Sequence, residues 1–375
     1  MYFKTIIHFK THEMLKYYIQ LTAIQLLLFI SVSLCAQGVI TTPRTPSPAA
    51  SVTQIIGIST VTVSYSRPSV KGREIWGALV PYGYNVQAFG KGNPAPWRAG
   101  ANENTTITFS NDAMVEGKPV PAGAYGLFFV INKDNTGEVI LSKDYRSWGS
   151  FFYDSTHDLF RAKIQLQDIP STEMLTYEFL NDTKTGAELV LNWEKKQFPV
   201  KIEFDVDKIV MDNAREQLKN TVGFSWQGFL SAANYALQNK TNIEEGLAWA
   251  DNAVTANKSF ATLSTKSGLL KLTGKTDEAD KTMKDAVDVA TENELNLYAY
   301  QVMNQGDIDK AIEMFILNTK RHPESANVWD SLGEGYVNKG DKKDAIDSFK
   351  KSLSMNPPAN VKANSEKFLK QLGAL

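Results

Sequence analysis

Apolar and polar residues alternate along the first half of the chain, between about residues 47 and 205. Val61, Val63 and Tyr65 alternate with serine and threonine residues. The same two-residue period recurs at residues 125–131, 160–166, 175–179, 189–193 and 200–204. Alternation of this kind predicts strands with one buried face and one solvated face. About eight or nine such strands, with turn signals between them and no intervening amphipathic helix, predict an antiparallel β-sandwich.

From residue 207 onward the apolar residues recur at helical spacing. Glycine recurs at intervals of 32 and 34 residues, and alanine follows five positions later: Gly274, Gly306, Gly340, Ala279, Ala311 and Ala345. Glycine ends the first helix of a pair, and alanine lets the two helices approach closely. Helix pairs are therefore predicted at about residues 227–259, 260–291, 292–325 and 326–359. A capping helix over 360–375 completes an all-α solenoid at 207–375, so two domains are expected.

The last predicted helix pair carries seven residues at a recognisable spacing: Trp329, Leu332, Gly333, Tyr336, Ala345, Phe349 and Pro357. They resemble the tetratricopeptide (TPR) repeat, a helix–turn–helix unit whose copies stack into a concave surface. The resemblance implies a groove for a protein or peptide partner, at Asn293, Asn296, Tyr300, Asn304, Asn327, Asp330, Glu334 and Asn338. Asparagine can bond an extended backbone as donor and acceptor. A structural role, such as dimerisation or bracing the sandwich, stays open.

The segment between Ser66 and Glu103 breaks the strand pattern, because it is rich in glycine, proline, arginine and aromatic residues. Long loops are often functional, and arginines beside aromatic rings bind carboxylates, phosphates or sugar faces. We expect a site for a small polar or anionic ligand at Arg67, Lys71, Arg73, Trp97, Arg98, Asn102 and Glu103. The alternative is that the arginines pair with Glu74, Glu103 or backbone carbonyls and fasten the loop to the sandwich.

Several segments of the first half resemble a known family, among them YSRPSVKGR, WRAGANE and PAGAYGLFFV. They are similar to the exported bacterial domain of unknown function 2911, over about residues 47–205. The resemblance implies a β-rich fold and export, and the family has no agreed activity. This chain departs from the family pattern at about Tyr84 to Ala95. There an additional segment rich in glycine and proline is expected to cover or reshape the arginine-rich loop.

Residues 1–36 have the pattern of a signal peptide. Lys10 and Lys16 precede an apolar run from Ile19 to Leu34, and this run is too short and interrupted for a transmembrane helix. Residues 37–46 are then a linker, and the mature protein is expected in the periplasm or outer cell envelope, or secreted, with no integral membrane span. Cys35 is the single cysteine, and its lipidation is the alternative to soluble export. Translation could also start at Met14.

Composition disfavours most kinds of enzyme and of nucleic-acid binding. The formal net charge is −1 and no basic stripe is present, so no nucleic-acid partner is expected. After signal cleavage only His157 and His322 remain, in different predicted domains, so neither a metal site nor a catalytic triad is expected. No cofactor is expected either. The alternative is an envelope enzyme acting on glycan or peptidoglycan, with Glu103 beside Arg67, Arg73 and Arg98.

Overall fold

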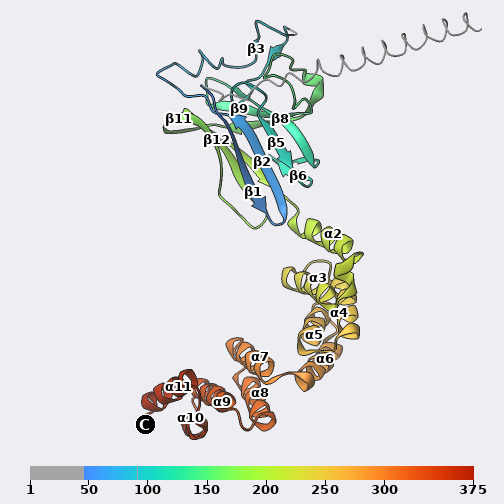
Figure 1. Ribbon diagram of the computed structural model, residues 1–375, viewed down its shortest axis with the longest axis vertical. Helices are drawn as coiled ribbons and strands as arrows, with labels where there is room; N and C mark the ends of the chain where they lie inside the picture. Colours follow the sequence, from blue (N-terminus) through green and yellow to red (C-terminus); the bar gives the residue numbers. More distant parts are fainter. Residues whose placement is uncertain (1–45, 91) are drawn as a thin grey trace, which may run out of the picture.

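The computed structural model describes residues 46–90 and 92–375, and it consists of a β-rich unit followed by ten helices (Figure 1). The predicted signal peptide, Cys35 and nearly all of the predicted linker lie outside the described residues. Within these residues no helix is long and apolar enough to cross a membrane.

The β-rich unit contains two antiparallel sheets. The first has six strands in the order β1-β2-β5-β8-β9-β10. These strands are β1 Ala49–Ile56, β2 Ser59–Ser66, β5 Thr106–Phe109, β8 Gly123–Ile131, β9 Thr136–Ser142 and β10 Asp158–Gln165. The second sheet, in the order β11-β12-β6-β7, contains β11 Gln167–Leu180, β12 Gly186–Glu203, β6 Ala113–Val115 and β7 Lys118–Val120. A separate short hairpin joins β3 Asn85–Val86 to β4 Pro94–Ala95.

One hydrophobic core fills the space between the two sheets. Every second side chain of β2 is buried there, including Val61 and Val63, because successive residues of a strand point to opposite faces. From the opposite sheet, β12 contributes Leu191 and Trp193 to the same core. The predicted antiparallel sandwich is therefore confirmed.

The carboxyl-terminal half is a solenoid of stacked helices that extends away from the sandwich (Figure 1). The helices are α2 Val206–Leu218, α3 Trp226–Asn239, α4 Ile243–Ala256, α5 Phe260–Leu272, α6 Thr276–Val289, α7 Glu292–Asn304, α8 Ile308–Arg321, α9 Ala326–Lys339, α10 Lys342–Ser354 and α11 Ala359–Gln371. A 3-10 helix, η2 Thr221–Phe224, lies between α2 and α3. This architecture confirms the predicted TPR-like solenoid.

The repeating glycine and alanine residues have the roles that the sequence predicts. Gly340 follows α9 with φ 82°, a left-handed conformation that glycine adopts without strain. Ala345 has no exposed surface, since α9 and α10 are packed together at this position. A larger side chain there would force the two helices apart.

The stack of helices is nearly interrupted between α6 and α7. Over the described residues, α4 packs on α5 and α8 packs on α9, whereas α6 and α7 have little contact. The buried apolar clusters on the two sides are separate, and Leu297 on α7 is 61% exposed. One ring contact crosses the joint, between Phe260 of α5 and Tyr298 of α7, with centroids 5.7 Å apart. A side-chain bond from Arg321 Nη1 to the Val287 carbonyl oxygen, at 2.5 Å, crosses this joint. The solenoid therefore consists of two sub-stacks, α2–α6 and α7–α11.

Helix α2 connects the solenoid to the sandwich. Its first residue, Val206, is buried in the sandwich core, and the Asp205 carboxylate caps the helix by accepting from the Lys208 backbone N–H at 3.1 Å. From the β11–β12 turn, Lys184 Nζ donates to Asn239 Oδ1 at 2.6 Å and lies 3.9 Å from the Asp207 carboxylate. The two halves are thus joined by apolar packing as well as by the chain.

Candidate functional site

A pocket of about 570 Å³ opens beside the arginine-rich loop of the sandwich. Its walls come from residues 68–80, residues 97–102 and the loop that contains Phe151, and Trp193 of β12 also contributes. Five of the seven residues that were predicted for ligand binding line it: Lys71, Arg73, Trp97, Arg98 and Asn102. The fold therefore brings together side chains that are up to 31 positions apart in the sequence.

Aromatic rings form the inner wall of this pocket. Trp97 is held in the sheet by two 2.9 Å backbone bonds with Phe129, and its ring stacks on Trp193 with centroids 5.8 Å apart. Trp76 meets both indoles edge to face. Trp193 is 1% exposed, and its indole N–H has no hydrogen-bond partner among the described residues. A buried donor without a partner costs free energy.

Arg98 is the most enclosed cation of the pocket. Its Nη1 donates to the Asn102 carbonyl oxygen at 2.7 Å, and its guanidinium lies 5.3 Å from the Phe151 ring centroid. A Cβ on Gly149 would lie 2.3 Å from Nη1, so any larger residue at this position would displace the guanidinium. Burial lowers the pKa of Arg98, although arginine remains charged at any physiological pH. Within the described residues no carboxylate pairs with it.

Lys71 and Arg73 add two further cations at the mouth of the pocket. Arg73 is held by two backbone carbonyls, since its Nε donates to Val70 at 3.1 Å and its Nη2 donates to Ser69. The backbone N–H of Lys71 donates to Glu173 Oε1 at 3.0 Å. The lining described here contains three cations and neither aspartate nor glutamate. This arrangement favours an anion.

Arg67 and Glu103 lie outside the lining of the pocket. Arg67 donates from Nε to the Leu175 carbonyl oxygen at 3.0 Å and from Nη2 to Thr176 Oγ1 at 2.7 Å. Arg67 therefore fastens the loop to β11. This is the role that the alternative interpretation gave to the arginines of this loop. The pocket does not combine Glu103 with Arg67, Arg73 and Arg98, which the enzyme alternative required.

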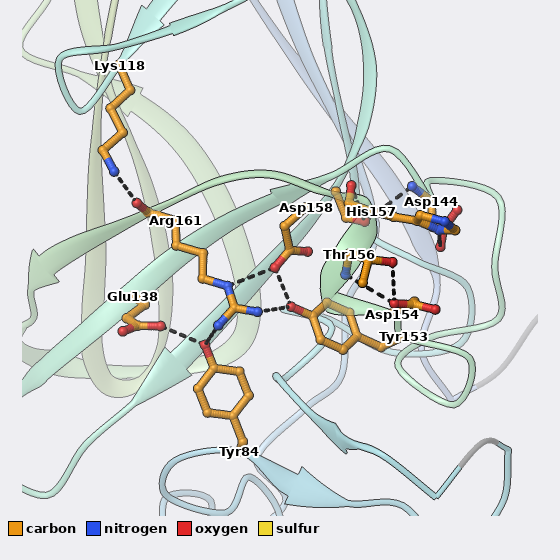
Figure 2. A network of polar contacts seen from close by, with 11 residues as sticks. Tyr84, Lys118, Glu138, Asp144, Tyr153, Asp154, Thr156, His157, Asp158 and Arg161 are labelled. Carbon is orange, nitrogen blue, oxygen red and sulfur yellow. Dashed lines mark hydrogen bonds and ion pairs between the residues drawn. The ribbon is translucent and has the colours of Figure 1, made fainter.

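A second polar network fastens the additional segment near Tyr84 to the edge of the first sheet (Figure 2). Tyr84 donates to Glu138 Oε2 at 2.7 Å, and Tyr153 donates to Asp158 Oδ2 at 2.6 Å. Arg161 joins the two pairs, because it donates to both phenol oxygens at 3.0 Å and to Asp158 Oδ2 at 2.8 Å. Burial and the neighbouring carboxylates raise the pKa of both tyrosines, so neither is an ionised nucleophile. From the sequence, Tyr153 and Asp158 belong to a polar cluster at the start of a strand, but nothing connects them to Tyr84 or Arg161.

The turn before β10 holds the polar residues near His157. The Asp154 carboxylate accepts from the Thr156 backbone N–H at 3.1 Å and from its hydroxyl at 2.7 Å, which caps the 3-10 helix η1 Ser155–His157. His157 Nδ1 lies 2.7 Å from Asp144 Oδ2 on the surface. Across the described chain, no three histidine, cysteine or acidic residues are grouped as metal ligands.

The predicted peptide-groove residues of α7 and α9 have two different environments. Asn293 and Asn327 are exposed. Asn296 is buried, and its Oδ1 has no hydrogen-bond partner among the described residues. Tyr300 is half-buried and packs edge to face on Phe315, with centroids 5.0 Å apart. The exposed amides alone are directly accessible to a partner.

Asp330 and Glu334 lie at the contact between α9 and α11. Asp330 is 5% exposed; it accepts from the Ser365 hydroxyl and, at 2.8 Å, from Asn364 Nδ2. The same Nδ2 donates to Glu334 Oε1 at 2.7 Å. Burial raises the pKa of both carboxyl groups. A peptide could reach Asp330 only after α11 moved, so the capping helix occupies the position predicted for a ligand.

Comparison with known families divides the chain in the same way. Residues 47–202 match the family described as protein of unknown function (DUF2911). The amino-terminal unit is therefore similar to this family over most of its length. Residues 326–358 match a tetratricopeptide repeat family, so both resemblances expected from the sequence are confirmed. No curated protein matches the chain.

Solved structures similar to the chain include a TPR protein. They include YrrB, described as a TPR protein with an unusual peptide-binding site, at 15% identity over 43% of this chain and 84% of that one (TM-score 0.27). The pilF protein of Pseudomonas aeruginosa is 17% identical over 40% of this chain and 71% of its own chain (TM-score 0.27). MamA is 16% identical over 39% of this chain and 80% of its own chain (TM-score 0.27). No functional argument follows from likeness at this level.

Proposed function

We propose that this protein is an exported, non-enzymatic binding protein whose two halves hold different molecules. The TPR repeats support a role as a protein-interaction scaffold. In the proposal, the sandwich domain binds a small anionic ligand in the Arg98 pocket, and the repeats hold a protein partner in the cell envelope. The signal-like pattern of residues 1–36 supports export.

One observation supports the ligand most strongly: Lys71, Arg73 and Arg98 line a single pocket whose described lining contains neither aspartate nor glutamate. Cations that lack acidic partners attract an anion, and a partly buried site strengthens that attraction relative to water. The indole faces of Trp97 and Trp193 form the adjoining wall. The preferred ligand therefore combines an anionic group with a flat apolar or sugar face.

Arg98→Ala tests the ligand site, and Arg146→Ala is its matched control, because Arg146 is an exposed arginine outside the lining. Glucose 6-phosphate, indole-3-acetate and uncharged glucose serve as calorimetric probes. We expect an anionic probe to bind. Arg98→Ala should weaken its binding about tenfold to a hundredfold, because this is the factor that the loss of a hydrogen bond to a charged group produces. Arg146→Ala should change little. Equal binding of glucose and glucose 6-phosphate would exclude an anion site.

The scaffold half of the proposal is tested by affinity capture from envelope extract. The bait is the chain with or without residues 207–375. Partners that depend on the repeats should disappear from the shorter bait. Identical sets of captured proteins would show that the repeats are not the binding surface.

A further inference from the structure

The Arg98 pocket opens at the end of the sandwich that is remote from the solenoid. At the near end the β1–β2 turn packs on α2, because a Cβ on Gly57 would lie 2.6 Å from Val206 Cγ1. From that turn β2 runs for 8 residues to Ser66, a rise of about 26 Å. The loop that supplies Lys71 and Arg73 to the pocket begins there, and the β3–β4 hairpin lies at the same end (Figure 1). The pocket is therefore on the opposite side of the sandwich from α2.

Exposed apolar side chains lie beside the mouth of this pocket. Leu79 and Trp148 are exposed and belong to its lining. Phe89, between β3 and β4, is 66% exposed, and its ring meets Phe151 and Phe152 edge to face with centroids 5.8 and 6.0 Å apart. Phe151 also lines the pocket, so these rings continue its wall outward. We call the exposed residues Leu79, Phe89, Trp148 and Phe152 the apolar rim.

The apolar rim and the cations of the pocket form one surface of mixed chemistry. An exposed apolar patch indicates an interaction surface, and the phenyl rings of Phe89 and Phe152 favour an apolar medium over water. Lys71 and Arg73 are exposed cations of the same pocket mouth, whose described lining contains neither aspartate nor glutamate. The exposed Glu74 follows them in the chain but lies outside that lining. The surface therefore matches a molecule with an anionic head and an apolar chain.

We propose that this end of the sandwich docks on an anionic phospholipid membrane, with a lipid phosphate in the Arg98 pocket and the apolar rim in the interfacial layer. The inference rests on the proposed anion site and deepens it, because it assigns the anion to a lipid headgroup. Each cation beside an anionic membrane surface raises the affinity about fivefold. Each phenyl ring that leaves water for the interfacial layer adds about tenfold.

The position of the apolar rim favours a lipid over a soluble anion or a glycan. A small soluble anion would use the pocket alone, because Phe89 and Phe152 lie outside its lining. A glycan needs hydrogen bonds beside the rings on which it stacks, and phenyl rings supply none. A phospholipid carries its apolar chains to the rim while its phosphate meets the cations. The solenoid would then extend into solution from the opposite end of the sandwich.

The test is flotation of the mature chain, residues 37–375, with lipid vesicles. Starting at residue 37 removes the apolar run of residues 19–34, which would bind any vesicle by itself. The vesicles contain equal parts of phosphatidylglycerol and phosphatidylcholine, or phosphatidylcholine alone. Phe89→Ser removes one ring of the apolar rim. Phe224→Ser is the matched control, because Phe224 is 88% exposed on η2, outside the rim. Arg98→Ala removes the enclosed cation of the pocket.

We expect the chain and Phe224→Ser to bind the vesicles that contain phosphatidylglycerol, and to bind them more weakly at high salt. Arg98→Ala should weaken this binding about fivefold, because one cation is lost. Phe89→Ser should weaken it about tenfold, because one phenyl ring is lost from the interfacial layer. Phe89→Ser should still bind glucose 6-phosphate, since Phe89 lies outside the pocket lining, and this retained binding shows that the variant folds.

Several results would overturn the inference. Equal binding to both kinds of vesicle would exclude an anionic headgroup, and equal losses in Phe89→Ser and Phe224→Ser would exclude the apolar rim. If glucose 6-phosphate bound but vesicles did not, the membrane would be excluded and the proposed anion site would stand. If that result came with a protein that the chain captures and Phe89→Ser does not, the partner of the rim would be a protein. Loss of both vesicle and glucose 6-phosphate binding would overturn the anion site as well.

Discussion

At the scale of single residues, the Arg98 pocket depends on a glycine that makes space for a cation. Gly149 has φ 59°, and the atoms nearest to an added Cβ would belong to the Arg98 guanidinium. Two constraints therefore coincide at this position: a left-handed backbone and contact with the charged group. Nearby, the buried indole N–H of Trp193 has no hydrogen-bond partner among the described residues.

Replacing Gly149 should separate the two constraints when Gly117 is replaced in parallel. Gly117 has φ 71° with open space around it, so Gly117→Ala adds backbone strain alone. We expect both variants to lose about 1–2 kcal/mol in urea unfolding. Gly149→Ala alone should also lose the anionic probe, because Arg98 is displaced. If both variants kept the probe, the contact between Gly149 and Arg98 would not define the pocket.

The sequence identified the residues around this pocket but not the division of labour among them. Arg67 and Arg98 are both arginines of one irregular segment, and composition treats them alike. Their roles differ because Arg67 faces carbonyl and hydroxyl oxygens of β11, whereas Arg98 lies over Phe151. Those neighbours are distant in the chain, so only the tertiary fold determines which arginine remains without a full set of partners.

At the scale of elements, the segment from Tyr84 to Ala95 is a short hairpin tied to the edge of the first sheet. The sequence showed this segment to be additional to the family pattern, but gave no means of locating its anchor. The anchor is Tyr84, which bonds Glu138 of β9 and Arg161 of β10. The Phe89 ring also meets Phe151, with centroids 5.8 Å apart, so the hairpin extends to a wall of the Arg98 pocket.

Tyr84→Phe should release this hairpin with little effect on the rest of the sandwich. The change removes the hydroxyl that bonds Glu138 and Arg161, and the loss should be about 1 kcal/mol or less at this partly exposed site. Amide hydrogen exchange at residues 84–90 should become faster. Tyr82→Phe is the control, because no hydrogen bond joins the Tyr82 hydroxyl to the described residues. Equal exchange in both variants would contradict an anchoring role.

The contact between α9 and α11 should make the stability of the solenoid depend on pH. Burial raises the pKa of Asp330 above its ordinary value of 3.8, so the folded state holds the proton more tightly than the unfolded state. Its contribution to stability is therefore complete below pH 3.8 and is lost as the pH rises through the raised pKa. In urea unfolding, the free energy of unfolding should fall less steeply above pH 3.8 in Asp330→Asn than in Asp309→Asn. Asp309→Asn is the control, because the Asp309 carboxylate is exposed. Identical slopes would contradict this assignment.

At the scale of the whole molecule, helical periodicity predicted the order of the helices but not the weak joint between α6 and α7. The helix pairs on both sides of this joint, α5–α6 and α7–α8, have the expected glycine and alanine residues. The joint arises from how two neighbouring pairs orient, which depends on many side chains at once. Leu297 is exposed on α7, but nothing in the sequence distinguishes it from a leucine that packs between helices. Repeat-based reasoning assumes uniform stacking and therefore could not locate the interruption.

Two truncations should distinguish the weak joint from an ordinary repeat boundary. Ending the chain at residue 290 cuts where α6 and α7 have little contact, whereas ending it at residue 325 separates α8 from α9. The second cut exposes Phe315 and Ile312, which lie in one apolar cluster with Leu332. We expect the longer product to bind more of the dye ANS and to melt less cooperatively. Stronger dye binding by the shorter product would place the weak joint elsewhere.

The joint between α6 and α7 also affects how far the protein can reach. Only Ala290 and Thr291 separate these two helices, so a small rotation of either peptide unit would swing all of α7–α11 once the Arg321–Val287 bond and the Phe260–Tyr298 ring contact were broken. The far tip of α7–α11 would travel much further than the pivot itself. One chain could then connect two binding partners, one on the sandwich and one on α7–α11, over a range of distances between them.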